Sequence, residues 1–540
     1  MKPSRWISRG TLQSSYQIQQ RCLFHDYFVT HLPSSSLHPD SRSATGPNHH
    51  KLPRQASTPA GPLSRSPTSI PQSVGVSRET TVVRIPLKSA KHHFGAGVSR
   101  GSRPYNEDTF QAGTIEVPAF AKRQPMSLTR RGAIPQQKGA DSASGDPQVF
   151  YFGVFDGHGG SECSKFLQER LHTYVEEAAV KFDMQSSLRD RKEEADGAQD
   201  AKQKEIMNLE RKLVDTWKRT VGGYFKRFRP EYFTALQRSG NPERTTSSSA
   251  TSSPESPSSI EAVLTYAFLH ADLDFTSAQA TKHSPSPTSD DPVLDDKPLN
   301  ENDILSSPLK PASQNLTSKL KEPIGGDTRF KGGSTASIAM ISTPSPTPFW
   351  NPASPSTIVV AHVGDTRILL CKVSDGESVS LTTNHHPSTP VEATRLRRYA
   401  ATFVTDSFGE ERVLGLANTR AFGDISSKRI GVSAEPEINI VQLAPSEYSF
   451  MVLMSDGVSG TLSDQEVVDI VKEAKTPEQA SRDVVNFATE VSEDADNATA
   501  LVVRLGGWER RGEGGAGSLG TREMRDFKKS EAENPRARRQ

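Results

Sequence analysis

The stretch "YFGVFDGHGG" (Tyr151–Gly160) joins an apolar run to an abrupt polar ending. The apolar residues up to Phe155 predict a fully buried strand, and Asp156 follows directly at its end. The glycines beyond Asp156 allow the backbone to turn and to approach a ligand closely. Three interpretations compete, namely a phosphate-binding glycine loop, a metal site and a simple turn. Because a single Asp-Gly pair after a strand is usually a turn, the rest of the sequence has to decide.

Neither common phosphate-binding loop fits this stretch. A Walker-type loop ends in Lys followed by Ser or Thr, and "DGHGGSE" (Asp156–Glu162) contains no lysine. A dinucleotide-binding loop requires the spacing G-x-G-x-x-G with an acid about twenty residues further on, which "GHGGSE" does not follow. The stretch is therefore left as a metal site or a turn.

Three more acids stand at the ends of apolar runs. Asp365 follows "VVAHVG", Asp456 follows "FMVLMS", and Asp496 with Asn497 precedes "ATALVV". If these strands converge at one edge, the carboxylates would meet Asp156 there and repel one another unless a cation neutralised them. Oxygen ligands without clustered Cys or His select Mg²⁺ or Mn²⁺ over zinc. Since a pair of such ions activates water and binds phosphoryl oxygens, the residues alone favour a metal-dependent hydrolase.

The composition indicates one large folded domain with unstructured additions. Only 34% of the 540 residues are hydrophobic, and Ser and Pro gather in discrete blocks. We predict a domain over residues 91–508 with low-complexity insertions at about 240–259 and 281–325, a disordered N-terminal region 1–90 and a basic, disordered tail 509–540. Strand runs and helix runs do not alternate strictly. We therefore expect an α+β fold in which two antiparallel sheets form a β-sandwich flanked by helices.

Charge and targeting signals limit the partners and the compartment. The net charge of +1 gives no electrostatic reason to expect nucleic acid, and no run reaches the ~18–20 apolar residues of a membrane span. Three scattered cysteines (Cys22, Cys163 and Cys371) fit a reducing compartment. The N-terminus carries four basic residues and no acid before Asp26, which is typical of a mitochondrial transit peptide. We predict a mitochondrial protein, with the matrix favoured and the cytoplasm as the alternative. A merely basic, disordered tail is the alternative interpretation of the N-terminus. The sequence leaves the oligomeric state open, with a monomer favoured.

Eight motifs occur in a fixed order between Phe94 and Leu505. They are "SRGSRPYNED", "FGVFDGHGG", "GGSTASIAMI", "AHVGDTRILL", "TRAFGDISSK", "SAEPEI", "LMSDGVSG" and "DNATALVV". In this order they resemble the metal-dependent serine/threonine protein phosphatases of type 2C, including fungal mitochondrial members. The resemblance implies a β-sandwich flanked by helices, two Mg²⁺ or Mn²⁺ ions at one end with a third in some members, and phosphoprotein substrates.

The resemblance also implies roles for individual residues. The implied metal ligands are Asp156, which would bridge the ions, the carbonyl of Gly157, Asp456 and Asp496, with Glu107 and Asp108 acting directly or through water and Asp365 joining Asp456 at a third ion. Arg103 matches the phosphate-binding arginine, and His158 matches the proton donor to the departing Ser or Thr oxygen. The implied reaction is a direct attack of metal-bound hydroxide on phosphorus, without a covalent intermediate. We expect Arg420, Gly423 and Asp424 to hold a loop rather than to perform chemistry.

Two alternatives to an active phosphatase stay open at this point. A catalytically inactive relative acting as a binding module would typically have lost an acid of the metal set, whereas this chain keeps Asp156, Asp456 and Asp496. A two-metal nuclease or nucleotide hydrolase would need a basic groove, which the near-neutral charge disfavours. Metal-dependent hydrolysis of a phosphothreonine peptide is the measurement that separates these functions.

Overall fold

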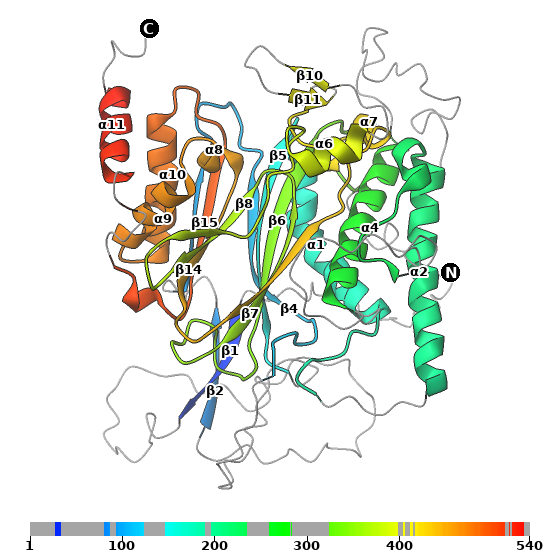
Figure 1. The fold of residues 1–540 in the computed structure, drawn as a ribbon, viewed down its shortest axis with the longest axis horizontal. Coiled ribbons are helices and arrows are strands. Elements are labelled where there is room, and N and C mark those ends of the chain that lie inside the picture. Colours follow the sequence, from blue (N-terminus) through cyan, green and yellow to red (C-terminus); the bar gives the residue numbers. More distant parts are fainter. Residues whose placement is uncertain are drawn as a thin grey trace, which may run out of the picture.

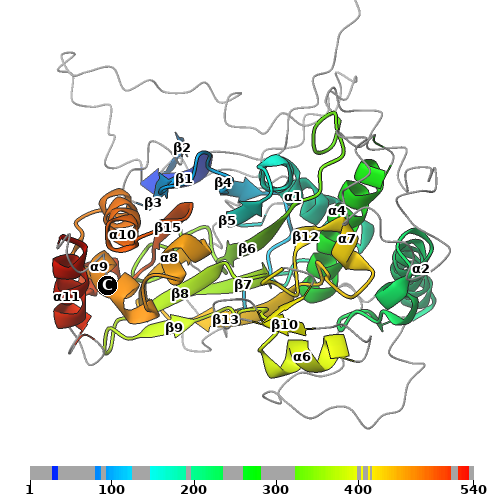
Figure 2. The same cartoon turned by 90° about the horizontal axis from the view of Figure 1, so that it is seen from above.

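Two antiparallel sheets lie face to face, and helices cover both outer faces (Figure 1; Figure 2). The computed structural model describes residues 27–33, 80–86, 93–123, 146–189, 196–234, 259–280, 282, 323–397, 403–405, 411–413, 416–512, 518 and 521–533. This arrangement confirms the predicted α+β sandwich with helices outside.

The strands of the sandwich form two continuous sheets. The first contains, in order across the sheet, β13 (Glu437–Leu443), β7 (Ser356–Val363), β6 (Gly333–Ser342), β5 (Val149–His158) and β4 (Thr109–Ile115), with β12 (Phe422–Gly423) paired to the start of β6. The second contains β3 (Phe94–Ser99), β15 (Ala498–Arg504), β14 (Tyr448–Met454), β8 (Arg367–Lys372) and β9 (Ser378–Ser380). All neighbouring strands run antiparallel.

The helices form two outer layers. The layer on the first sheet contains α1 (Glu162–Lys181), α2 (Asp196–Thr220), η3 (Gly223–Arg227) and α4 (Ile260–Ala280). The layer on the second sheet contains α8 (Asp456–Ser459), α9 (Asp464–Glu473), α10 (Pro477–Val491) and, after η4 (Trp508–Arg510), α11 (Thr521–Glu533). At the top of Figure 1 lie α6 (Pro390–Arg397), β10 (Phe403–Thr405), β11 (Glu411–Val413) and α7 (Ile425–Lys428).

The position of strand β5 between two buried layers explains why its sequence is apolar throughout. Tyr151 and Phe155 belong to the hydrophobic cluster between the first sheet and its helices, whereas Phe150 and Phe152 belong to the cluster between the two sheets. Successive side chains of a strand point to opposite faces, so a strand between two buried layers has no polar alternation. The prediction of a fully buried strand is confirmed.

The register of the strands brings the acids to one end of the sandwich. Asp156 pairs with Thr335 near the start of β6, because β5 ends where its antiparallel neighbour begins. In the second sheet, Met454 at the end of β14 pairs with Ala500 near the start of β15. The same alternation places the end of β7 beside the start of β6. The four strand-end acids Asp156, Asp365, Asp456 and Asp496 therefore meet at one edge, as the strand-end pattern predicted.

Part of the N-terminal region predicted to be disordered is a two-stranded sheet, so the prediction was wrong there. Within residues 1–90, β1 (Tyr27–Pro33) pairs antiparallel with β2 (Thr80–Pro86). Both segments, "YFVTHLP" and "TTVVRIP", are rich in aromatic and β-branched residues, which favour strands. The Ser- and Pro-rich sequence around them hid this signal. The first 26 residues, with the predicted transit peptide, lie outside the described residues.

The tail predicted to be disordered also contains a helix. Arg525 of α11 forms an ion pair of 2.8 Å with Glu473, and Lys528 forms one of 2.9 Å with Glu466, so α11 is bound along α9. A segment rich in charged residues resembles a solvated tail unless its partner is known, which is why residues 521–533 were misassigned. Most of the two predicted insertions lies outside the described residues.

Two helices of the C-terminal half begin at sequences that favour helix starts. Ser463 and Glu466 form a capping box at α9, and Thr476 caps α10 with Pro477 in its first turn. In the part of the chain that the structure describes, no helix combines the length and the apolar character needed to cross a membrane.

Candidate active site

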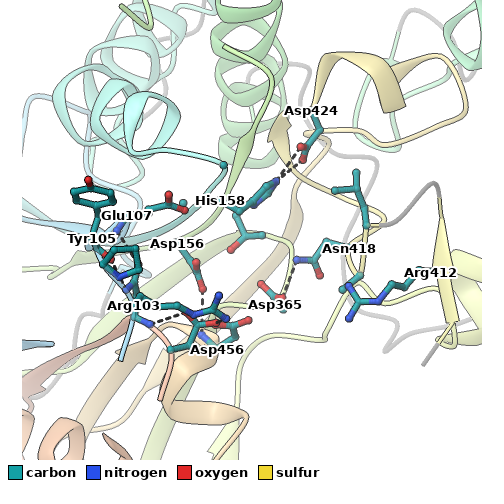
Figure 3. A pocket seen from close by; sticks show the side chains of 18 residues that line it. Arg103, Tyr105, Glu107, Asp156, His158, Asp365, Arg412, Asn418, Asp424 and Asp456 are labelled. Carbon is teal, nitrogen blue, oxygen red and sulfur yellow. Dashed lines mark hydrogen bonds and ion pairs between the residues drawn. The ribbon is translucent and has the colours of Figure 1, made fainter. Parts of the chain in front are cut away.

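A cleft of about 470 Å³ opens at the end of the sandwich where the acids converge (Figure 3). Its lining includes six carboxylates and two guanidinium groups, contributed by Glu107, Asp156, Asp365, Asp424, Asp456 and Asp496 and by Arg103 and Arg412. Such an excess of negative charge repels a phosphate group unless cations are bound. The cleft can therefore bind an anionic substrate only when cations are already bound.

Asp156, Asp365 and Asp456 form the centre of the cleft. One carboxylate oxygen of each lies within 4.8 Å of the others, and the backbone N–H of Asp456 donates to Oδ2 of Asp156 at 3.3 Å. Burial, followed by the charge of Asp456, raises the pKa of Asp156 well above its usual range. Burial, followed by the charge of Asp365, raises the pKa of Asp456 to about 7. The surrounding protein thus leaves these negative charges uncompensated.

Two buried carboxylate oxygens indicate whether a cation fits this cleft. Among the described residues, Oδ1 of Asp108 and Oδ1 of Asp365 have no hydrogen-bond partner. Their second oxygens do have partners, since Ser455 Oγ donates to Asp108 at 2.8 Å and Asn418 Nδ2 donates to Asp365 at 2.7 Å. Burial raises the pKa of Asp108 to about 6. Orphaned oxygens beside a close carboxylate group are the donors that a hard divalent cation prefers, so this set fits Mg²⁺ or Mn²⁺.

Gly157 is required by close packing. A Cβ at this position would lie 2.5 Å from the carbonyl oxygen of Glu107 and 2.9 Å from Oγ of Ser164. Ser164, at the start of α1, also donates a hydrogen bond to that carbonyl. Any larger residue would therefore push Glu107 and Asp108 away from Asp156.

The structure pairs Arg103 with Asp496, through Nη2 and Oδ2 at 2.8 Å. A residue predicted to bind phosphate thus contacts a residue predicted to bind metal, and Asp496 lies outside the group of three oxygens described above. Asn497, to which the sequence assigned no role, fixes this region. Its Nδ2 donates to the carbonyl of Tyr105 at 2.9 Å, and its Oδ1 accepts from the backbone N–H of Glu107 at 2.8 Å.

His158 is held by a residue that sequence reasoning treated as structural. Both carboxylate oxygens of Asp424 lie 2.9 Å from Nε2 of His158 (Figure 3). Burial alone lowers the pKa of His158, but the Asp424 carboxylate outweighs it and the net shift is upward. Asp424 adopts a left-handed backbone conformation with φ of 42°. Its position in "TRAFGD" was recognised, but no local sequence signal indicates a contact with His158.

The loop around Asp424 is fastened by two buried ion pairs. Arg420 donates from Nε and Nη2 to one oxygen of Glu392, at 3.1 and 2.8 Å, which agrees with its predicted role in holding the loop. The backbone N–H of Gly423 donates to Asp272 at 2.9 Å, and the other oxygen of Asp272 lies 2.6 Å from Nζ of Lys428. Because both members of this second pair are fully buried, helix α4 fixes the loop that carries Asp424.

A second group of possible metal ligands lies away from the cleft. His362, His385 and Glu437 each offer one atom within 4.8 Å of the others. However, Nε2 of His362 lies 3.0 Å from the carbonyl of Thr383, and Nδ1 of His385 accepts from the backbone N–H of Gly364 at 3.0 Å. Burial lowers the pKa of both histidines, so they act as neutral hydrogen-bonding groups of the core.

Comparisons with known proteins agree with the motifs. A family model described as "Protein phosphatase 2C" matches residues 244–496. "Protein phosphatase 2C homolog 4" of Schizosaccharomyces pombe is 30% identical over 433 residues, which cover 79% of this chain and 84% of that protein. "Protein phosphatase 1K, mitochondrial" of Xenopus laevis is 37% identical over 152 residues, 28% of this chain and 40% of that protein.

Among solved structures, a serine-threonine phosphatase 2C from Toxoplasma gondii aligns with a TM-score of 0.42 at 15% identity, over 76% of this chain and 94% of that chain. That similarity is too low to support an argument. The relative from Schizosaccharomyces pombe, in contrast, is matched over most of both chains. The chain therefore belongs to the protein phosphatase 2C family of Mg²⁺- or Mn²⁺-dependent protein serine/threonine phosphatases.

Proposed function

We propose that this phosphatase hydrolyses phosphoserine and phosphothreonine by direct attack of water on phosphorus, without a covalent enzyme intermediate. The observation that carries the proposal is the anionic cleft, in which Asp156, Asp365 and Asp456 bring oxygens within 4.8 Å of one another beside Arg103. A phosphorylated side chain enters such a cleft only with cations in place. Metal-dependent hydrolysis of a phosphate ester is the chemistry that matches this requirement.

The donor groups divide into three sets in this proposal. Two ions would be held by Asp156, the carbonyl of Gly157, Asp456 and Asp496, with Glu107 and Asp108 acting directly or through water, and a weaker third ion by Asp365 with Asp456. When bound, Mg²⁺ or Mn²⁺ activates a water molecule and neutralises phosphoryl oxygens. The orphaned oxygens of Asp108 and Asp365 support this assignment.

The chain's own side chains bind the phosphate and supply the proton. Arg103 carries a half-exposed guanidinium at the edge of the cleft, where its planar fork can bind two phosphoryl oxygens. His158 donates a proton to the departing Ser or Thr oxygen. Because Asp424 engages Nε2, the donating atom is Nδ1. Asp424 is then a positioning residue, which holds the ring and fixes the tautomer.

A phosphopeptide assay tests the function directly. The purified full chain should release phosphate from a phosphothreonine peptide with Mn²⁺ or Mg²⁺, and EDTA should abolish the release. Asp156→Ala should be inactive, whereas Asp526→Ala, which removes an exposed carboxylate from α11, should retain full activity. Activity that persists in EDTA, or that Asp156→Ala leaves unchanged, would refute the metal assignment.

We also propose that the protein acts as a monomer on phosphoproteins of the mitochondrial matrix. The support for the compartment is the basic, acid-poor N-terminus and the word "mitochondrial" in the name of one relative. A fusion of residues 1–60 to a fluorescent protein should co-localise with a matrix marker, and a cytoplasmic signal would contradict the proposal. Light scattering on the purified chain measures the oligomeric state.

A further inference from the structure

Seven basic side chains lie close together in sequence on α2 and the turn that follows. Residues 211–229 contain Arg211, Lys212, Lys218, Arg219, Lys226, Arg227 and Arg229, with Asp215 as the one acid. The whole chain of 540 residues has a net charge of +1, so this segment concentrates positive charge well beyond the average. We call these seven residues the basic ridge.

The fold presents the basic ridge outward on a rigid support. Trp217 and Phe225 between the basic residues are fully buried and stack with ring centroids 4.3 Å apart. Nε1 of Trp217 also donates to the carbonyl of Leu269 in α4 at 3.1 Å. With the apolar face of α2 fixed in the core, the basic side chains are left at the surface. Helix α2 lies at the outer edge of the molecule in both ribbon views (Figure 1; Figure 2).

Most of this charge is uncompensated. Lys218 pairs with Asp215 at 3.0 Å, and Arg219 binds a backbone carbonyl and a hydroxyl. In the part of the chain that the structure describes, the other five side chains form no ion pair or side-chain hydrogen bond; they are Arg211, Lys212, Lys226, Arg227 and Arg229. The α2 part of the ridge also lines a surface hollow of about 540 Å³. Neighbouring like charges repel, so an anionic ligand would stabilise this surface.

The basic ridge is joined to the loop that borders the catalytic cleft. The backbone N–H of Tyr224, in η3, donates to the carbonyl of Arg429 at 2.8 Å. Arg395 of α6 also lies over the Tyr224 ring, 5.4 Å from its centroid. Arg429 directly follows α7, and Asp424, the residue before α7, contacts His158. A protein bound at the cleft can therefore extend along this loop to the ridge.

We propose that the basic ridge docks an acidic segment of the protein substrate, rich in Asp, Glu or phosphorylated residues, while the phosphoryl group occupies the cleft. The proposal rests on the function proposed above for the cleft. The charges of the two surfaces are opposite. Because the six carboxylates of the cleft offer acidic segments no counter-charge of their own, such segments need a separate cationic surface.

Binding to a fluorescein-labelled oligoglutamate peptide, measured by anisotropy with the full chain in EDTA, tests the docking without any hydrolysis. The ridge variant Arg211→Gln/Lys212→Gln/Arg227→Gln should weaken binding about tenfold, since several exposed pairs of modest strength are lost together. The control variant Lys475→Gln/Arg510→Gln/Lys529→Gln removes the same charge from exposed positions outside the basic ridge, after α9, in η4 and in α11, and should bind like wild type. Added salt should weaken wild-type binding.

Turnover measurements distinguish the proposed docking role of the basic ridge from the proposed phosphatase function of the cleft. A short phosphothreonine peptide without acidic residues should be hydrolysed equally by all three proteins. Extending it with an oligoglutamate tract should lower KM for wild type and the control variant but not for the ridge variant. Equal oligoglutamate binding by the two variants would overturn the docking role, as would wild-type binding to phosphatidylserine vesicles but not to the peptide. Loss of hydrolysis of both peptides with intact binding would instead refute the proposed function.

Discussion

Both carboxylate oxygens of Asp424 lie 2.9 Å from Nε2 of His158, although 266 residues separate the two in sequence. The contact joins the loop after β12 to the end of β5, directly beyond Asp156. Two motifs that stand far apart in the chain therefore form a single unit at the cleft. The proposed proton donor His158 and the residue that positions it, Asp424, can therefore be tested together.

Replacing Asp424 with Asn keeps the shape of the side chain but removes its charge. We expect Asp424→Asn to lower kcat on a phosphothreonine peptide by about 10- to 100-fold, because the imidazole loses its orientation and its protonated form is less favoured. Hydrolysis of p-nitrophenyl phosphate should fall much less, since that leaving group departs without a proton. Equal losses on both substrates, with an unchanged Tm, would show that Asp424 does not act through proton donation.

Removing one acid from the centre of the cleft should have opposite effects on stability and metal binding. Asp456→Asn should raise the Tm in EDTA, because one of three mutually repelling carboxylates is lost. Calorimetric titration should show Mn²⁺ affinity reduced by at least about 10- to 100-fold. The exposed control Asp526→Asn should change neither quantity. A metal-free Asp456→Asn protein that is less stable than wild type would contradict the repulsion described here.

Glu176 gives a pH-dependent stability prediction. This residue of α1 is only 6% exposed, and burial raises its pKa to about 7, although it accepts a hydrogen bond from the backbone N–H of Glu116. An unfolded Glu loses its proton near pH ~4.3, so folding retains a proton and stability falls as the pH rises from about 4 to about 7. Glu176→Gln should match wild type near pH 4 and exceed its unfolding free energy by roughly 2–4 kcal/mol at pH 8. A pH-independent difference in denaturant titrations would contradict the assignment.

The buried Glu392 should be essential for the stability of the loop region. Its carboxylate accepts hydrogen bonds from both Arg395 and Arg420, and from Thr419 Oγ1 at 2.6 Å. Glu392→Gln leaves two largely buried guanidinium groups without their counter-charge, which should cost about 3–5 kcal/mol of unfolding free energy. Adding Arg420→Met to that variant should restore part of the loss. Strictly additive losses in denaturant titrations would show that Glu392 and Arg420 do not depend on each other.

Local sequence signals predicted the fold and the convergence of the strand-end acids on one cleft. The apolar run that ends at Phe155 indicated a strand buried on both faces, and the register of antiparallel strands then brought Asp156 and Asp456 together. The composition did not predict the short ordered segments that are flanked by polar sequence. Strands β1 and β2 and helix α11 depend on pairing with distant partners, which a local window does not contain.

Contacts between side chains that lie far apart in the chain could not be predicted from the sequence. The pairing of Arg103 with Asp496 and the anchoring of Glu107 by Asn497 each cross about 390 residues. Such contacts follow from the final packing rather than from propensity or spacing, so motif matching assigned the residues to separate roles.

Strands β5 and β6 pair along nine residues, from Phe150 opposite Ile341 to His158 opposite Gly333, although all four helices of the first helical layer lie between them in sequence. A break in the backbone anywhere in residues 283–322 would interrupt none of the described helices or strands. The two pieces would stay associated through this ladder and through the pairing of β3 with β15 in the second sheet. The enzyme can therefore be divided at this point into two co-expressed fragments, which would make it a split phosphatase whose activity reports their assembly.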